Sequence, residues 1–454
     1  MQAFALSALW NFVWFMVFLG ILILIHEFGH YAAAKLCGVR VETFSLGFGK
    51  RLVGFRKGDT DYRISALPLG GYVKMAGENP LEAHSGAPDE FMSHPRWQRF
   101  VIALAGPAMN ILLAVSVLTG VNMVHYRHPK FLDEPAVVGE VKADSPAARA
   151  GIKPGDKIVR IDGWQNPTWE DVDLKSSIQR KVPLDIAVQR GNEIVETPLP
   201  ATPEGADPAQ AAPFMGMVPA EPANEPLIVS QIEPSMPAAK AGMQVGDQIV
   251  AVNGEPMHSL RAVIAYLQQQ GGTPVTISVL RNGQELKFTA TPVMDSGEKR
   301  YRLGFGAERY TVGGLPFWKA LDKSIEQNEK YSLLIIDLVR QMLRNQASIK
   351  QMEGPIGIAR AAGQVAQQPD WSIRLGFLAL ISLNLGIFNL LPIPILDGGM
   401  ILMLIVEGLF RRNISVRIKE RIYQTAFVFL VLFAVVVIYN DIVKALPGLP
   451  HRLP

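Results

Sequence analysis

The stretch FVWFMVFLGILILIHEFGHYAAAK, residues 12–35, joins an apolar run directly to two histidines and a glutamate. A helix needs about 20 mostly apolar residues to cross the hydrocarbon core of a bilayer, and the sequence predicts a first membrane span over residues 4–30. No Lys or Arg precedes Lys35, so we expect a retained span rather than a signal peptide. Ionisable side chains at membrane depth are costly and usually mark a function. His26, Glu27 and His30 are therefore candidate functional residues.

Three further regions predict spans: residues 101–124, a region that begins near residue 375, and residues 422–439. The composition agrees, with 49% hydrophobic and only 19% charged residues, where about a quarter of residues are charged in soluble domains. The third region is interrupted by PIPILDGG, residues 392–399. Prolines disrupt helical hydrogen bonding there and glycines permit tight turns. We expect a multi-pass α-helical membrane protein with four spans.

Charge predicts how these spans are oriented. Lys and Arg gather in the loop of residues 31–97 and again just before the fourth span, at Arg411, Arg412, Arg417, Lys419 and Arg421. Such residues favour the cytoplasmic side, which places both termini and residues 125–370 outside. The net charge of +3 is too small to indicate nucleic-acid binding, and the single cysteine, Cys37, excludes an intrachain disulfide framework.

The outer segment contains a repeat. SPAARAGIKPGDKIVRIDG at residues 145–163 recurs as MPAAKAGMQVGDQIVAVNG at residues 236–254, an offset of 91 residues. This period is too long for a solenoid and fits two copies of a small α+β domain. The pattern resembles bacterial PDZ domains. We expect domains at residues 126–220 and 221–312, between a first membrane part at 1–125, a membrane-proximal amphipathic connector at 313–370 and a second membrane part at 371–454.

His26 and His30 lie one helical turn apart, about 40° apart on one face. Two such imidazoles can share a metal ion while Glu27 reaches a water molecule beside it. A zinc ion held by two histidines needs a third protein ligand and keeps a position for water. The alternative is a histidine pair stacked at a helix end near lipid headgroups.

Asp397 is the candidate third ligand, because it stands alone in an apolar stretch of residues 375–406. Irregular backbone at membrane depth is tolerated only where protein buries it, so a bend would present this carboxylate to the first span. Asp397 could instead pair with a buried cation, but no Lys or Arg lies in the apolar part of any predicted span. Asn384 and Asn389 are buried amides; Asn384 could bond a neighbouring helix and Asn389 could contact substrate.

HEFGH in a first span with NLLPIPILDGG in a later one is similar to the site-2 protease family of intramembrane zinc metalloproteases. Further matches are FSLGFGK at 44–50, PLGGYVKM at 68–75, AGPAMN at 105–110 and EGPIGIA at 353–359. The resemblance implies one zinc ion held by His26, His30 and Asp397, Glu27 as general base and acid, and Asn389 near the substrate. One departure is Met400, where many members have histidine at a position that is not a ligand.

The resemblance also implies a bacterial inner-membrane protein. It implies single-pass transmembrane substrates, such as an anti-sigma factor cut first on its outer side. The alternating pattern of residues 39–75 predicts a small sheet dipping into the membrane, to whose edge an extended substrate could add. The repeats would bind an exposed C-terminus or exclude bulky outer domains. The alternatives are a non-catalytic membrane PDZ scaffold and a zinc carrier.

Overall fold

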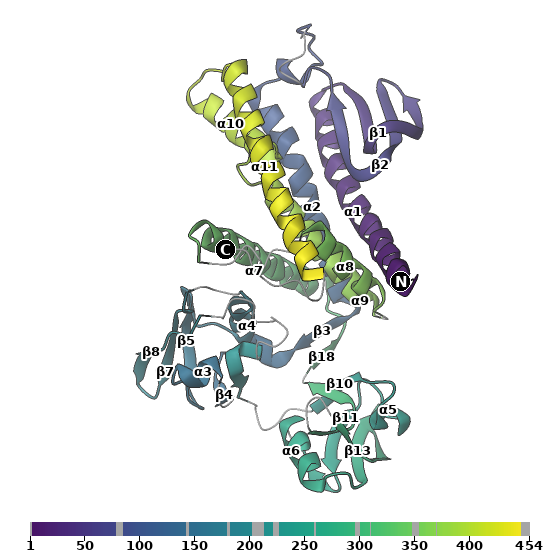
Figure 1. Cartoon of the computed structure of the whole chain (residues 1–454), viewed down its shortest axis with the longest axis vertical. Helices are drawn as coiled ribbons and strands as arrows, with labels where there is room; N and C mark the ends of the chain where they lie inside the picture. The colour runs from purple at the N-terminus through teal and green to yellow at the C-terminus, as the bar shows by residue number, and fades with distance from the viewer. Residues whose placement is uncertain are drawn as a thin grey trace. The chain divides into compact units, whose positions relative to one another are not determined.

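The computed structural model describes residues 2–78, 85–141, 145–178, 182–201, 213–220, 227–257, 260–295, 300–308, 310–346, 354–368 and 370–445. The chain forms two compact units (Figure 1). The first comprises Met1–His125, Gly314–Val339 and Ile349–Pro454, and the second comprises Tyr126–Gly313 with Arg340–Ser348. The first unit carries the apolar helices and the second carries the repeats.

The first unit is a helical bundle with a small sheet. Its α-helices are α1 (Gln2–Cys37), α2 (Arg96–Val124), most of α7 (Phe317–Leu343), α8 (Pro355–Ala366), α9 (Trp371–Asn389), α10 (Asp397–Leu409) and α11 (Val416–Ala445), with a short η1 (Phe91–Ser93) before α2. Helix α2 packs against α1, α9 and α10, and α8 packs against α1, α9 and α11. Within the described residues, four helices are long and apolar enough to cross a membrane: Leu9–Cys37, Arg96–Val124, Trp371–Asn389 and Val416–Val443.

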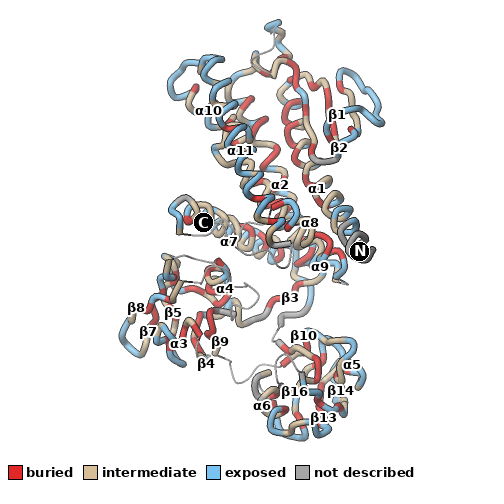
Figure 2. Tube along the Cα trace, in the orientation of Figure 1, coloured by how far each residue is buried: buried red, intermediate tan, exposed pale blue. Residues whose placement is uncertain are grey.

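Exposed apolar faces identify this unit as membrane-embedded. Figure 2 shows exposed and half-buried residues along α1 and α11, whereas buried residues gather where helices meet. The exposed side chains include Phe12, Val13, Val17, Ile21, Phe427, Val428, Leu432 and Val436. A contiguous apolar surface of this kind marks contact with an apolar environment, and here it lies on helices of spanning length. The chain is a membrane protein.

Strands β1 (Val41–Lys57) and β2 (Thr60–Met75) form the sheet predicted for residues 39–75, with a more complex pairing than a simple hairpin. Thr43 pairs with both Asp61 and Lys74, and Leu46 pairs with both Ile64 and Gly71. The start of β1 is therefore flanked by two parts of β2, residues 71–75 on one side and residues 61–64 on the other. Residues 51–57, the end of β1, pair with the far side of residues 60–65. Residues 71–75 pair on one side only within the described chain. Both strands contact α1 (Figure 1).

The second unit contains two copies of one arrangement. The first copy is built from η2 (Lys130–Asp133), β4 (Val138–Val141), α3 (Pro146–Arg149), β5 (Lys157–Ile161), β6 (Trp164–Gln165), α4 (Trp169–Ser177), β7 (Ile186–Arg190), β8 (Glu193–Glu196), η3 (Pro213–Gly216) and β9 (Met217–Pro219). The second is built from β10 (Leu227–Ile232), α5 (Pro237–Lys240), β11 (Gln248–Val252), β12 (Glu255–Pro256), α6 (Leu260–Gln270), β13 (Val275–Arg281), β14 (Gln284–Ala290), β15 (Val293–Asp295), β16 (Arg300–Arg302) and β17 (Phe305–Glu308).

The two copies share most of their strand pairing, although β10 also pairs with β11, whereas β4 and β9 form a sheet of their own. In each, the first strand pairs with the last, β4 with β9 and β10 with β17. The antiparallel pairs β5–β7 and β7–β8 correspond to β11–β13 and β13–β14. Each copy has its own apolar core. Strands β3 (Tyr126–Pro129) and β18 (Tyr310–Gly313) pair with each other, which brings the two ends of the repeat segment together.

A buried aspartate fixes the GD turn in each copy. Arg190 donates to both carboxylate oxygens of Asp156, from Nε at 2.8 Å and from Nη2 at 2.7 Å, and the Lys153 N–H donates at 2.8 Å. Asp247 and Arg281 repeat this arrangement 91 residues later. Burial opposes ionisation of Asp156, but the hydrogen bonds from Arg190 and Lys153 outweigh it and hold the pKa of its carboxyl below the ordinary value.

Asp156→Asn should loosen the first repeat. Because the folded-state pKa of Asp156 is lowered, the interaction stabilises above the unfolded pKa of about 3.9 and is lost as pH falls through the folded-state value. At neutral pH we expect hydrogen exchange of residues 151–161 in the full chain to accelerate roughly tenfold or more. Asp185→Asn is the control, because the Asp185 side chain is 52% exposed at its ion pair with Arg160. Equal exchange in both variants at neutral pH would contradict this role.

Candidate metal centre

His26, His30 and Asp397 come together although 371 positions separate His26 from Asp397. The Nε2 atoms of the two histidines lie 3.2 Å apart. Asp397 Oδ2 lies 3.2 Å from His26 Nε2 and 3.5 Å from His30 Nε2. Both histidines are only 9% exposed. Three donor atoms from two segments therefore converge on one point within the helical unit.

The spacing of these donors fits a tetrahedral metal ion. Zinc–ligand bonds of about 2.0–2.1 Å at tetrahedral angles separate ligand atoms by about 3.3 Å. The donor set, two imidazoles and one carboxylate, is also one that catalytic zinc uses, with a further position left for water. The residues present therefore fit a zinc ion both in chemistry and in spacing.

The hydrogen bonding of His30 supports the same conclusion. Its Nδ1 lies 2.8 Å from the carbonyl oxygen of Ile102 on α2, so Nδ1–H is the donor. A neutral His30 then presents its Nε2 lone pair to the Asp397 carboxylate and to His26. Ring nitrogens and a carboxylate oxygen within 3.5 Å of one another need a positive charge among them, and a metal ion can supply it in place of a proton.

A tight turn presents Asp397. Helix α9 ends at Asn389, and α10 begins with Asp397 itself after a short irregular segment. A Cβ on Gly398 would lie 2.3 Å from the carbonyl oxygens of both Leu390 and Leu391. A Cβ on Gly399 would lie 2.2 Å from the carbonyl oxygen of Ile393. The turn can pack this closely only because both positions are glycine.

A buried cation lies in the first turn of α2, just before the predicted span of residues 101–124. The helix begins at Arg96, earlier than the predicted residue 101, and Arg99 in its first turn is only 7% exposed. Its carboxylate neighbour is Glu407 on α10, which also pairs with Lys419 at 2.8 Å. The ion-pair partners of Asp397 within the described residues are the two histidines.

Glu27 lies between the metal-ligand candidates and the edge of the sheet. The backbone of Val73 hydrogen-bonds its carboxylate, and a Cβ on Gly71 would lie 3.1 Å from Glu27 Cγ. Strand β2 thus runs directly beside this side chain. A second carboxylate, Glu78, accepts from the Met75 N–H at 3.2 Å and lies within electrostatic reach of Glu27 and His30. The sequence analysis did not single out Glu78.

Helix α2 contributes residues that the sequence analysis recorded only as a matching motif, AGPAMN. A Cβ on Gly106 would lie 2.3 Å from His30 Nε2, so the imidazole occupies the space of the missing side chain. Asn110, one turn further on, places its carboxamide 3.3 Å from His26 Nδ1. Their i, i+4 spacing on one face of a predicted span was the available signal.

The remaining predicted residues lie outside this group of donors. Asn389 is the last residue of α9 and is partly buried, and its side chain makes no hydrogen bond to a described residue. Its substrate role stays a prediction. Asn384 Oδ1 is buried and likewise lacks a partner in the described chain. Met400 packs against the apolar cluster that contains Ala34 and Ile102.

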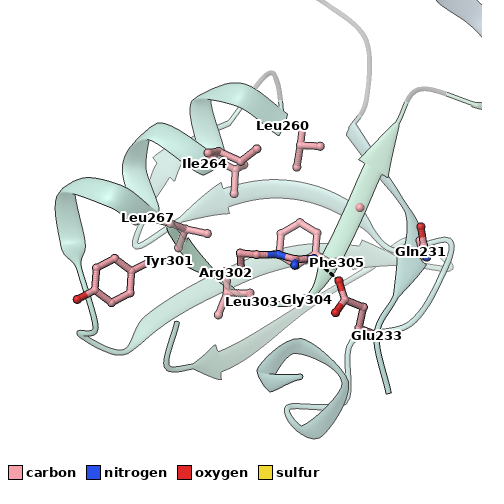
Figure 3. Close-up of a pocket in the computed structure, with 12 residues that line it drawn as sticks. Gln231, Glu233, Leu260, Ile264, Leu267, Tyr301, Arg302, Leu303, Gly304 and Phe305 are labelled. Carbon is pink, nitrogen blue, oxygen red and sulfur yellow. Dashed lines mark hydrogen bonds and ion pairs between the residues drawn. The ribbon is translucent and has the colours of Figure 1, made fainter. Parts of the chain in front are cut away.

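A separate cavity of about 230 Å³ lies in the second repeat, between α6 and strands β10 and β17 (Figure 3). Leu260, Ile264 and Leu267 line its helical wall, and Arg302 and Glu233 form an ion pair on the other wall. In the first repeat, Trp169 corresponds to Leu260 and is buried with Met215 and Met217 in the core. The two copies therefore differ at this position.

Comparison with known proteins identifies the family. Residues 14–433 match the model of peptidase family M50. The chain belongs to peptidase family M50. This is the site-2 protease family, so the resemblance drawn from the sequence is confirmed and the chain is a site-2-type metalloprotease.

Relatives match this M50 chain over nearly its full length. It is 33% identical to the regulator of sigma E protease of Salmonella typhi and 32% identical to the regulator of sigma-E protease RseP of Escherichia coli. Each match covers 96% of this chain and 99% of the relative. A Vibrio cholerae protein provisionally named a zinc metalloprotease is 32% identical with the same coverage.

Among solved structures, a PDZ domain of the SdrC-like protein of Listeria monocytogenes aligns with 18% identity. The alignment covers 19% of the M50 chain and 92% of that domain, with a TM-score of 0.18. This alignment covers a segment the size of one small domain. The evidence that the two repeats resemble each other is instead the strand pairing that they share.

Gly106→Ala should abolish metal binding by this M50 chain. The added methyl group would meet His30 Nε2 at 2.3 Å and displace the imidazole from the other two donors. Gly120→Ala on the same helix is the matched control, because a Cβ there meets nothing within 4 Å. The measurement is the metal-to-protein ratio of the full chain purified in detergent. A Gly106→Ala protein that is folded and retains the metal content of the parent would contradict the arrangement.

Proposed function

We propose that this chain is an intramembrane zinc metalloprotease that hydrolyses peptide bonds within transmembrane segments of single-pass membrane proteins. The observation that carries the proposal is the convergence of His26, His30 and Asp397 beside Glu27, in apolar helices of an M50 peptidase. One zinc ion per chain fits the single group of three such donors found among the described residues.

Each residue has a distinct part in the reaction. His26, His30 and Asp397 hold the zinc ion, which supplies Lewis acidity toward the hydrolytic water and the scissile carbonyl. Glu27 accepts the proton of that water and delivers it to the leaving amine. The Val73 backbone hydrogen bond keeps the Glu27 carboxylate in one orientation beside the sheet. Asn389 contacts the substrate.

The sheet edge beside Glu27 accounts for how a helical substrate is presented. A helix hides its peptide bonds in internal hydrogen bonds, so the substrate must be extended before attack. Residues 71–75 have one unpaired side within the described chain and run next to Glu27. The Val73 and Met75 backbones already bond Glu27 and Glu78, so an extended substrate adds to this edge through its remaining main-chain groups. Exposed Leu52, Val53 and Phe55 elsewhere in the sheet favour its contact with lipid.

The proposed setting is a bacterial inner membrane crossed four times. The basic loops before α2 and α11 face the cytoplasm. Both termini and the two repeats are then periplasmic, and the metal site lies near the cytoplasmic side, because His30 is followed directly by the first basic loop. Two relatives are named regulators of sigma-E protease. Anti-sigma factors already cut on their outer side are the proposed substrates, together with remnants of signal peptides.

The two repeats, taken as tandem PDZ domains at residues 126–220 and 221–312, act on the outer segments of substrates. We favour steric exclusion of substrates that still carry bulky outer domains. The cavity beside α6 supports a second role, capture of a peptide end, because apolar side chains line one wall and an ion pair the other. The connector at 313–370 joins these domains to the second membrane part.

The two alternative functions, a membrane scaffold and a zinc carrier, account for fewer features of the site than a protease does. A scaffold has no use for Glu27 beside three metal-binding donors. A carrier would distribute polar ligands along several spans, whereas the described residues hold one compact group. Membership of a peptidase family also favours hydrolysis.

Glu27→Gln should abolish cleavage while the zinc content stays near one per chain. The amide keeps the size of the side chain but cannot accept the proton. The assay is cleavage of a single-pass membrane substrate by the purified chain, with zinc measured in the same sample. Glu42→Gln, at an ion pair with Lys74 on the sheet, is the control that should remain active. Retained cleavage by Glu27→Gln would exclude the general-base role.

Removal of both repeats should permit cleavage of substrates that retain their outer domains. Since Pro129 pairs with Tyr310, residues 131–308 can be replaced by a short Gly/Ser linker without separating β3 from β18. The measurement compares cleavage of trimmed and untrimmed forms of one substrate. Unchanged selectivity would count against the filter.

Ile264→Trp, which fills the cavity of the second repeat, separates the two roles of the repeats. If the cavity captures a peptide end, this variant should cleave trimmed substrate more slowly than the parent does. If the repeats act only by steric exclusion, the rate of cleavage of trimmed substrate should stay the same.

A further inference from the structure

The two histidines of the metal site differ in what holds their second ring nitrogen. His30 Nδ1 lies 2.8 Å from a backbone carbonyl, that of Ile102. His26 Nδ1 lies 3.3 Å from a side-chain atom, Nδ2 in the carboxamide of Asn110. Asn110 is fully buried, and its other amide atom has no hydrogen-bond partner among the described residues. Only the support of His26 can therefore be removed by substitution.

The chemistry of a metal ligand decides which amide atom faces His26. The Nε2 atom of His26 points to His30 and Asp397, so Nε2 is the ligand atom and Nδ1 carries the proton. A proton on Nδ1 needs an acceptor, and an amide NH2 group there would set donor against donor. Because the oxygen and nitrogen of an amide have nearly the same shape, their assignment follows from the hydrogen-bond network. A zinc-bound His26 therefore requires the opposite orientation of the amide, with its oxygen toward Nδ1–H and its nitrogen in the place of Oδ1.

Neighbouring helices hold Asn110 in place. Ser382 Oγ on α9 donates to the Asn110 backbone carbonyl at 2.7 Å. Gly386, one turn further along α9, approaches so closely that a Cβ there would lie 3.0 Å from the Pro107 carbonyl oxygen and 3.5 Å from Asn110 Cβ. The carboxamide is thus fixed between α1 and α9, and its position is set by the packing of three helices.

We propose that Asn110 is a positioning residue for the metal centre: its side-chain oxygen accepts a hydrogen bond from His26 Nδ1–H and fixes the tautomer and ring orientation of His26. The inference rests on the proposed zinc site. Partners of this kind raise the basicity of the ligand, and their loss typically costs about 10–100-fold in metal affinity.

The test compares Asn110→Leu with Asn110→Asp in the full chain purified in detergent. Leucine keeps the volume and removes the acceptor, whereas aspartate keeps an acceptor oxygen in the same place. Zinc affinity, measured by competition with a chromophoric chelator, should fall about 10–100-fold in Asn110→Leu. It should stay equal to the parent or rise in Asn110→Asp. A residue that only filled space would give the opposite order, because leucine suits a buried apolar site better than a carboxylate does.

Asn122→Leu is the matched control, since Asn122 is also buried on α2 but bonds Ser324 instead of a histidine. Its zinc affinity should equal that of the parent. Equal affinity in Asn110→Leu and the parent, or weaker binding in Asn110→Asp than in Asn110→Leu, would overturn the positioning role while leaving the protease proposal intact. A parent chain that binds no zinc would instead refute the proposed function itself.

Discussion

The close approach of α1 to α2 is the constraint on which the metal site depends. A Cβ on Gly29 would lie 2.3 Å from the carbonyl oxygen of Ala105, and the imidazole of His30 occupies the space beside Gly106. Small residues at such crossings let helix backbones meet in an apolar environment, where packing and hydrogen bonds hold helices together. This contact brings His30 within reach of the Ile102 carbonyl and His26 within reach of Asn110.

Once α1 lies on α2, the arrangement of the other elements follows from the cost of polar groups at membrane depth. Two imidazoles and a carboxylate cannot remain unpaired there. The turn before α10 delivers Asp397 to the histidines, and the sheet edge delivers a backbone hydrogen bond to Glu27. Arg99, Glu407 and Lys419 form a second ionic group, separate from the three metal-ligand candidates. Hydrolysis becomes possible inside an apolar bundle because the polar groups that it needs stabilise one another.

Sequence reasoning found the residues whose polarity is unusual for their surroundings. His26, Glu27 and His30 have a helical spacing, Asp397 is an isolated carboxylate, and the repeat is visible as an offset of 91 residues. It missed Gly106 and Asn110, because a glycine and an amide are ordinary in a membrane helix. Their role is visible only when the structure shows that they contact His30 and His26. It also missed the double pairing of β1 with β2, since alternation predicts strands but not which strands meet. The start of α2 lay five residues earlier than predicted, which concealed Arg99.

X-ray absorption at the zinc edge of the purified full chain tests the central claim most directly. If His26, His30 and Asp397 hold one zinc ion, the spectrum should show two imidazoles and further oxygen ligands at about 2.0–2.1 Å. One imidazole should disappear from the spectrum of His30→Ala. A chain without stoichiometric zinc, or a zinc ion surrounded by water alone or by sulfur, would contradict the account.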